Sequence, residues 1–200
     1  MRKLRSVLTV CGLAAVASVG VAACGSSSDD GGGAGGGDKP TSAKIGSILP
    51  DNYDPVLYQS IKANEALQLV YTGLITYKHA EGAAGNELIP GVAEALPTVS
   101  ADKKTYTFKL RAGLKYSDGE PVVASDFEHT IKRLTYLGGP YSSFSTGIVG
   151  VDAYSKAKKP DADISGITSN DTTGEITVNL TAPDSKFLFA IALVSAAPTP

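Results

Sequence analysis

The sequence predicts an α+β fold, in which helices pack on one side of antiparallel strands. Residues 105–110 and 175–180 alternate apolar and polar side chains, as strands with one solvent-exposed face do. Residues 124–137 place apolar side chains at helical spacing. Because no internal repeat is visible, a repeat architecture is not expected.

The segment before the first alternating strand is expected to contain a short strand, a loop and a helix. Residues 45–49 are an apolar run that indicates a strand, and the DNYDP segment at 51–55 ends it as a loop. Residues 60–75 carry apolar side chains at positions that suit one face of a helix, namely Ile61, Ala66, Leu67, Val70 and Leu74. This spacing predicts a helix over 60–75, and Ser60 is its expected N-cap.

Two strands with one buried face are expected downstream. Their inner side chains are Tyr106, Phe108 and Leu110 in residues 105–110, and Ile176, Val178 and Leu180 in residues 175–180. Turns are expected at 117–119, where Gly119 can adopt a positive φ, and at 170–174.

Two further helices complete the predicted fold. In residues 124–137, Phe127, Ile131 and Leu134 lie at i, i+4 and i+7, so one stripe of this helix faces a core. The last helix is expected at 185–194, between flanking prolines.

Residues 1–23 have the layout of an export signal. A basic start is followed by an uncharged run, Ser6 to Ala23, that is rich in small residues. The run ends in VAAC at 21–24, which resembles the lipobox of bacterial lipoproteins and predicts a lipid on the Cys24 thiol. An uncleaved membrane helix and an unmodified Cys24 are the alternatives. Residues 24–42 are rich in Gly and Ser and too poor in apolar side chains to fold, so they are predicted to be a flexible tether.

Charge and composition argue against several function classes. The chain has 18 Lys+Arg and 20 Asp+Glu, a net charge of −2, so no basic excess indicates a nucleic-acid partner. Both cysteines precede the globular part, and only two histidines, His79 and His129, are present. No GxSxG or HExxH motif occurs. We therefore expect no cofactor, no metal site and no enzymatic activity.

Seven short motifs occur in the order in which a known family carries them. They are VYTGLI at 70–75, LIPGVAE at 88–94, YTFKLR at 106–111, LKYSDG at 114–119, PVVASDF at 121–127, PYSSF at 140–144 and ISGI at 164–167. Each motif is weak alone, but together they extend over most of residues 45–200. The chain thus resembles the N-terminal portion of the family 5 extracellular solute-binding proteins, the peptide-type receptors of ABC importers.

This resemblance implies a two-lobed periplasmic-binding-protein-like fold of type II, cluster C-like. Residues 43–72 would begin the first ligand-binding lobe, 73–182 would form a second, accessory domain, and 183–200 would return towards the first lobe. Members of the family are considerably longer. The sequence is therefore expected to supply one wall of the cleft, either as a fragment or as a truncated relative.

The resemblance also implies five ligand-site residues. The loop after Asp54 faces the cleft in the family, so Tyr58, Gln59 and Ser60 are expected to contact the ligand while Asp54 orients the loop. Tyr141 matches a family tyrosine that reaches the cleft from the second domain, and a phenol suits a wet pocket. The structural alternatives are a plain surface loop and core packing of Tyr141.

The start of the helix at 124–137 departs from the family pattern. The family commonly has a threonine there with an acidic residue three positions on, where this chain has Val123 and Asp126. Valine cannot accept a hydrogen bond from the helix amides. The cap is therefore expected to be weaker by roughly 1 kcal/mol.

The function implied by the resemblance is that of a substrate-binding lipoprotein of an ABC importer. Its expected partners are a peptide-like solute, the membrane permease subunits and, through Cys24, the outer face of the cytoplasmic membrane, and it is expected to be a monomer. Relatives with this scaffold carry dipeptides, longer peptides, nickel complexes or sugars, so the solute stays open. Two other functions stay open as well, a secreted lipoprotein hydrolase whose catalytic half is missing and a structural surface lipoprotein.

Overall fold

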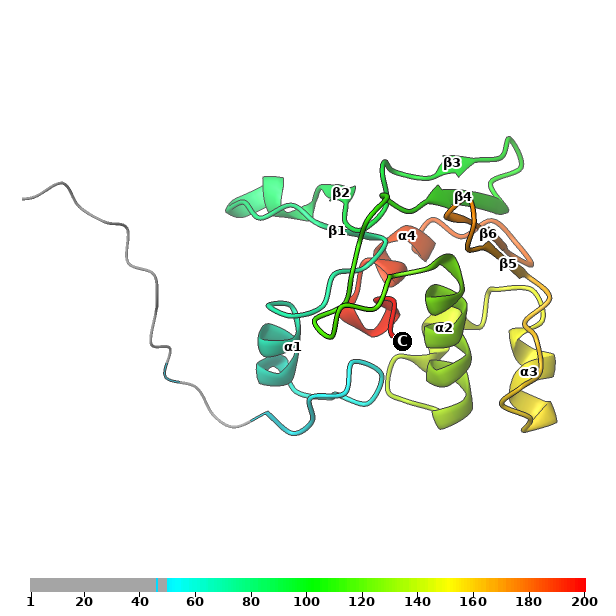
Figure 1. Cartoon of the computed structure of the whole chain (residues 1–200), viewed down its shortest axis with the longest axis horizontal. Helices are drawn as coiled ribbons and strands as arrows, with labels where there is room; N and C mark the ends of the chain where they lie inside the picture. Colours follow the sequence, from blue (N-terminus) through cyan, green and yellow to red (C-terminus); the bar gives the residue numbers. More distant parts are fainter. Residues whose placement is uncertain (1–45, 47–49) are drawn as a thin grey trace, which may run out of the picture. The chain divides into compact units, whose positions relative to one another are not determined.

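A computed structural model describes residue 46 and residues 50–200 (Figure 1). The helices are α1 (Ile61–Leu67), α2 (Ala124–Leu137), α3 (Val151–Ala157) and α4 (Phe187–Ile191), with 3-10 turns at Gly82–Asn86, Ser142–Ser145 and Val194–Ala196. The strands are β1 (Ile75–Tyr77), β2 (Leu88–Pro90), β3 (Thr98–Val99), β4 (Thr105–Lys109), β5 (Ile167–Asn170) and β6 (Glu175–Asn179). The predicted α+β fold class is confirmed. The expected strand at 45–49, the export signal, Cys24 and the tether lie outside the described residues.

The main sheet has four antiparallel strands in the order β3-β4-β6-β5. At its centre, β4 and β6 pair Tyr106 with Val178 and Phe108 with Ile176. All four side chains are buried, as the alternation predicted. A separate two-stranded antiparallel sheet is formed by β1 and β2.

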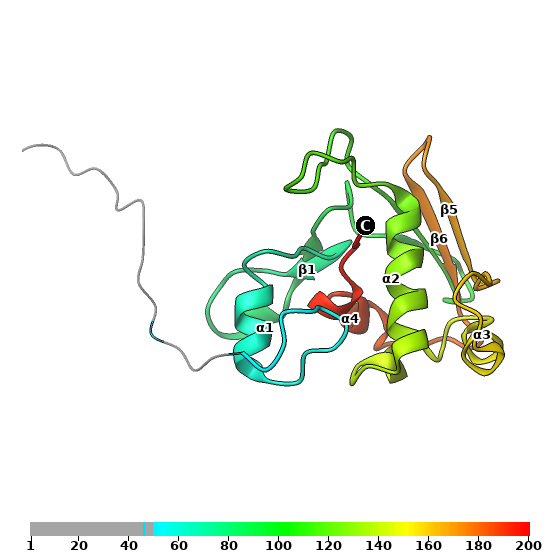
Figure 2. The ribbon, with the colours of Figure 1, turned by 60° about the horizontal axis from the view of Figure 1, so that its bottom comes forward.

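Helix α2 lies beside β5 and β6 (Figure 2). It has the predicted bounds, and the predicted stripe of Phe127, Ile131 and Leu134 is buried. Gly138 follows the helix with φ 64°, a left-handed conformation that favours glycine.

The N-terminus of α2 is capped in part from another element, the turn between β5 and β6. The Val123 N–H donates to Asp126 Oδ2 at 2.9 Å, which is the half of the capping box that was expected. The Ser125 N–H donates to Asp171 Oδ1 at 2.8 Å, and the Ser125 hydroxyl donates to Asp171 Oδ2 at 2.9 Å. Asp171, in the turn between β5 and β6, therefore supplies the acceptor that the valine side chain lacks.

The prediction of a helix over residues 60–75 was wrong in extent, because α1 ends at Leu67. Its start was right, since the Ser60 Oγ accepts the Ala63 N–H at 3.1 Å. The carbonyl groups of Gly73 and Leu74 instead accept backbone N–H groups from residues 91–93, at 2.9 to 3.1 Å. Residues 73–74 therefore extend the β1 hairpin.

The burial predicted for that helix was also partly wrong. Ala63 and Leu67 are buried, whereas Ile61 and Val70 are 76% and 73% exposed. Leu74 is buried, but in the main core and not on a helix.

The last predicted helix was too long as well. Residues 187–191 form α4, and a 3-10 turn at 194–196 follows it. The chain then continues between α1 and α2 (Figures 1 and 2). There the Thr199 N–H donates to the buried Thr130 Oγ1 at 3.0 Å.

The buried side chains form two clusters. The larger one joins the inner face of the main sheet to α2, α3 and α4. The smaller one consists of Tyr58, Ala63, Leu67 and Val194, with Tyr71 and Tyr141 packed against it. Within residues 50–200, none of the helices has the length and apolar character needed to cross a bilayer.

Candidate functional site

The candidate ligand-site residues lie on two segments that the fold brings together. One is the loop at 51–60, before α1, and the other is the segment at 139–141, after α2. The rings of Tyr58 and Tyr141 have their centroids 4.8 Å apart with an interplanar angle of 32°. At Gly139 a Cβ atom would collide with the carbonyl oxygen of Val56, so only glycine allows the two backbones to approach so closely.

Two aspartates fix the conformation of the 51–60 loop. The Asp54 carboxylate accepts the Val56 N–H at 3.0 Å, and the Asp54 carbonyl accepts the Tyr58 N–H at 3.1 Å. The Asp51 carboxylate accepts the N–H groups of Gln59 and Ser60 at 2.9 and 3.1 Å, and the Ser60 hydroxyl as well. Asp54 and Asp51 therefore both bond to the backbone of the loop, and the role of Asp54 in orienting it towards a ligand stays a prediction.

Asp54 is also held by an arginine from α2. Arg133 Nη1 donates to Asp54 Oδ1 at 2.7 Å, and Nη2 donates to Oδ2, so the pair is bidentate. The two side chains are 32% and 21% exposed, so this pair is better shielded than a surface ion pair. The hydrogen bond from Arg133 lowers the pKa of the Asp54 carboxyl below its ordinary value of 3.8.

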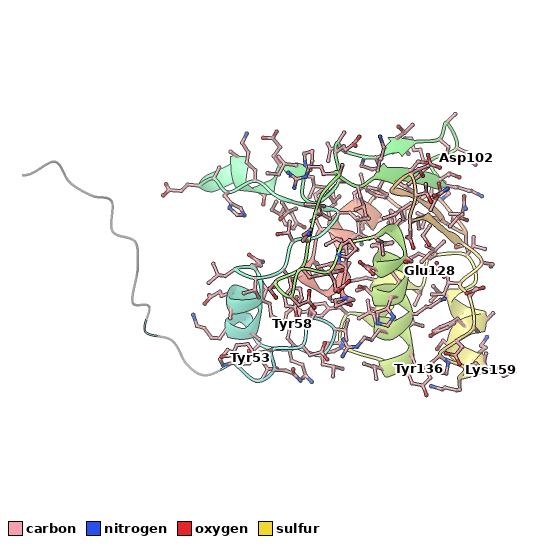
Figure 3. All side chains as sticks on the ribbon, in the orientation of Figure 1. Tyr53, Tyr58, Asp102, Glu128, Tyr136 and Lys159 are labelled. Carbon is pink, nitrogen blue, oxygen red and sulfur yellow. The ribbon has the colours of Figure 1, made fainter. Side chains whose placement is uncertain are left out.

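Of the two paired tyrosines, only Tyr141 has accessible surface. Tyr58 is 1% exposed within the smaller cluster, beside α1 (Figure 3). Burial, and then the neighbouring Tyr141, raise the pKa of the Tyr58 phenol, which therefore stays neutral. Tyr141 is half-buried, and its ring lies 5.8 Å from that of Phe144, which is 47% exposed.

Gln59 and Ser60, the two other loop candidates, also differ in whether their side chains are free. Gln59 is exposed, so its side chain is free to meet a ligand. Ser60 uses its hydroxyl as the N-cap of α1 and as a donor to Asp51. Among the loop candidates, Gln59 therefore has an exposed side chain, Tyr58 is buried, and Asp54 and Ser60 each accept a backbone N–H through a side-chain oxygen.

An open hollow of about 410 Å³ borders the loop on the side of the Asp54–Arg133 pair. Its lining is Tyr53, Asp54, Pro55, Tyr71, Arg133, Thr199 and Pro200. A second hollow of about 530 Å³ lies between residues 70–72 and the 114–118 turn, with Tyr116 and Asp118 in its wall. The walls of both hollows include aromatic and charged side chains.

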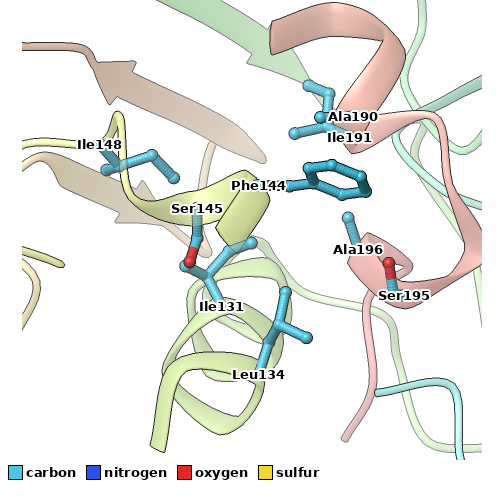
Figure 4. Close-up of a pocket in the computed structure, with 9 residues that line it drawn as sticks. All are labelled: Ile131, Leu134, Phe144, Ser145, Ile148, Ala190, Ile191, Ser195 and Ala196. Atoms are coloured by element: carbon cyan, nitrogen blue, oxygen red, sulfur yellow. The ribbon is translucent and has the colours of Figure 1, made fainter. Parts of the chain in front are cut away.

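A third cavity, among α2, α4 and the turn at 142–145, is a packing defect (Figure 4). It measures about 10 Å³, which is at most the space of one water molecule. Phe144 and apolar side chains of α2 and α4 line most of it. This cavity cannot hold a solute.

The part of the chain that the structure describes has neither a metal-binding cluster nor a buried histidine. No group of three or more His, Asp or Glu side chains there could hold a metal ion. His79 and His129 are both exposed.

Comparison with known proteins assigns this chain to a family. Residues 87–200, more than half of the chain, match the family described as bacterial extracellular solute-binding proteins, family 5 Middle. The chain belongs to this family. The resemblance inferred from the seven sequence motifs is therefore confirmed.

Several relatives of this chain are peptide-binding proteins. The dipeptide-binding protein DppE of Bacillus subtilis is 33% identical over 144 residues, 71% of this chain and 25% of the relative. The periplasmic oligopeptide-binding protein OppA of Escherichia coli is 37% identical over 98 residues, 47% of this chain and 18% of the relative. The crystal structure of Haemophilus influenzae OppA with the peptide RPPGFSPFR superposes with a TM-score of 0.65 at 27% identity. That match covers 76% of this chain and 29% of the other.

The chain matches only part of the length of each relative. The chain spans about a quarter of the length of the relatives that it matches. Over the matched residues, this chain and H. influenzae OppA share a mixed α+β arrangement. The bound peptide is a feature of the H. influenzae structure.

Proposed function

We propose that this chain is part of a peptide-binding receptor of an ABC importer and has no enzymatic activity. The proposal rests on one observation above all, the family match over residues 87–200. The named ligands of the relatives, dipeptides and oligopeptides, give the solute class. Neither a hydrolase nor a structural surface protein finds support among these relatives.

In this proposal the 51–60 loop and Tyr141 form one wall of the solute-binding cleft. Tyr141 and Gln59 touch the solute, and Asp54, Tyr58 and Ser60 hold the wall in shape. The half-buried ring of Tyr141 beside the exposed Phe144 supports this assignment, since aromatic side chains with one free face bind peptides well.

We also propose the two-lobed type II fold for the whole receptor. Residues 43–72 and 183–200 then contribute to the first lobe, and residues 73–182 form the accessory domain. The smaller cluster supports this division, because Val194 joins Tyr58, Ala63 and Leu67 there. Other side chains of the returning segment, Phe187 and Ile191 among them, belong to the larger cluster and connect the two parts.

We further propose that residues 1–42 are an export signal and a lipid tether. Cys24 would carry the lipid and hold a monomeric receptor at the outer face of the cytoplasmic membrane, next to its permease. The periplasmic relative from E. coli supports a place outside the cytoplasm. A Cys24→Ser variant should leave the membrane fraction, and a wild-type protein without a lipid mass on Cys24 would refute the anchor.

Peptide binding is tested on the protein as its gene encodes it. Dipeptides, the nonapeptide RPPGFSPFR, a nickel chelate and an oligosaccharide are compared by thermal shift and calorimetry. A ligand at 100 times its Kd adds about 2.7 kcal/mol to the free energy of unfolding, so even modest binding is visible. We expect peptides to bind and Tyr141→Ala to weaken them.

The control is Tyr136→Ala, a tyrosine that is 42% exposed on the last turn of α2, just before the segment that carries Tyr141. It should bind peptides like the wild type. If no peptide stabilises the protein, the proposed function is wrong. If only the nickel chelate or the sugar binds, the solute class is wrong.

A further inference from the structure

Arg133 is the polar link between α2 and the 51–60 loop. The hydrogen bonds that the structure gives its guanidinium, within residues 50–200, both go to the Asp54 carboxylate. Asp54 in turn bonds to the backbone N–H groups of Val56, Leu57 and Tyr58. The Val56 N–H bonds to the carboxylate that Arg133 holds, and the Leu57 and Tyr58 N–H groups bond to the Asp54 carbonyl. Arg133 therefore holds the aspartate to which the 56–58 backbone is hydrogen-bonded.

The loop is in turn packed against the segment that carries Tyr141. The Tyr58 ring lies 4.8 Å from the Tyr141 ring, and the Val56 carbonyl lies against Gly139. Both contacts are made by residues whose backbone Asp54 holds. The order of contacts thus runs from Arg133 through Asp54 and the 56–58 backbone to the ring of Tyr141.

We propose that Arg133 is a positioning residue for the solute site, which rests on the function proposed above. It sets the orientation of Tyr141 through Asp54 and the loop without touching the solute. The bidentate geometry suits this role, because two parallel hydrogen bonds fix the rotation of both side chains as well as their distance. Family membership alone does not assign this role, since it emerges from contacts between residues far apart in the chain.

The competing explanation is that Arg133 merely stabilises the fold. If that were so, replacing Arg133 would lower the free energy of unfolding and leave the native Tyr141 environment unchanged. The test therefore observes Tyr141 directly, in the native protein and without a ligand. The protein contains nine tyrosines, so 3-fluorotyrosine labelling gives a resolved set of ¹⁹F signals in which Tyr141→Phe identifies one.

Three variants are compared in the full chain. Arg133→Met removes both hydrogen bonds while keeping a long side chain, and Arg133→Lys keeps a charge and one bond. Lys132→Met is the matched control, because Lys132 is the neighbour of Arg133 on α2 and pairs with Glu128 and Asp163 at 3.0 and 2.9 Å, not with the loop. Should Arg133→Met fail to fold, Asp54→Asn breaks the same pair more gently.

We expect the ¹⁹F signal of Tyr141 to shift or broaden in Arg133→Met, to recover in part in Arg133→Lys and to stay in place in Lys132→Met. For the nonapeptide RPPGFSPFR we expect Kd to rise about tenfold in both Arg133→Met and Tyr141→Ala. The double variant should bind no more weakly than Tyr141→Ala, because both changes act on one ring.

An unchanged Tyr141 signal in Arg133→Met would overturn the proposal. The proposal would also be overturned if the rise in Kd of the double variant equalled the product of the rises in the two single variants. If the signal moves as expected but the wild type binds no peptide, the positioning role stands and the proposed function fails, so the two failures are distinguishable.

Discussion

The main sheet with α2 and the loop region around α1 are held together by different forces. The first region shares the larger cluster, in which Phe108, Phe127 and Ile176 are at most 1% exposed. The second has a cluster of four buried side chains and leaves Leu69 80% exposed. It depends instead on hydrogen bonds and an ion pair. Since apolar burial contributes most to stability, the proposed ligand wall is carried by the part of the fold that opens most easily.

Phe127→Ala should give the largest effect, because it leaves a cavity in the larger cluster. We expect the free energy of unfolding, measured by urea denaturation, to fall by about 4 kcal/mol. Tyr136→Ala, on the exposed face of the same helix, should change it by less than about 0.5 kcal/mol. Similar values for the two variants would mean that α2 does not face the main core.

Leu67→Ala should cost less and act locally. Its side chain is buried in the smaller cluster, so we expect a loss of about 2.5 kcal/mol. Hydrogen exchange should accelerate at the amides of α1 and stay slow in β4 and β6. Equal acceleration in both regions would show that the two clusters unfold as one unit and would remove the contrast between them.

Asp54→Asn tests the polar link by pH. A carboxyl whose pKa is lowered in the folded state contributes stability above its unfolded pKa, here 3.8, and loses that contribution as pH falls through the folded pKa. The wild type should therefore be about 1.5 kcal/mol more stable than Asp54→Asn at pH 7. The gap should close as the pH falls below 3.8. A gap that is constant with pH would contradict the role of the Arg133 pair.

Asp171→Ala should give the smallest effect, about 1 kcal/mol, because it removes one helix cap. In a Val123→Thr background the same change should cost less, since the threonine hydroxyl can then accept the amide hydrogen. Asp152→Ala is the control, as Asp152 pairs with Lys156 on the exposed face of α3. If Asp171→Ala costs no more than the control, the cap is not made in solution.

The sequence predicted those elements whose own apolar periodicity shows which face is buried. The bounds of α2 and the inner faces of β4 and β6 follow from periodicity, because one apolar face meets one core. β5 was missed because Ile167 is its single apolar inward side chain, and Ser169 donates to Glu128 of α2. α1 was predicted too long because Val70 and Leu74 continue an apolar spacing, whereas the backbone of residues 73–74 bonds to residues 91–93.

Only part of the candidate site could be predicted from the sequence. Tyr58 and Tyr141 came from the resemblance, and the structure brings their rings together. The hydrogen bonds from Arg133 to Asp54 and from Ser125 to Asp171 connect residues 79 and 46 positions apart. No local pattern carries such pairs, so only the folded chain reveals them.

The proposed wall of the solute-binding cleft consists of the 51–60 loop and Tyr141. Its most direct test is hydrogen exchange of the protein with and without RPPGFSPFR. The account predicts slower exchange of residues 51–60 and 139–145 when the peptide is bound, with no change in α3 or in the turn between β5 and β6. Protection of α3 alone, or peptide binding that leaves both segments unchanged, would contradict it.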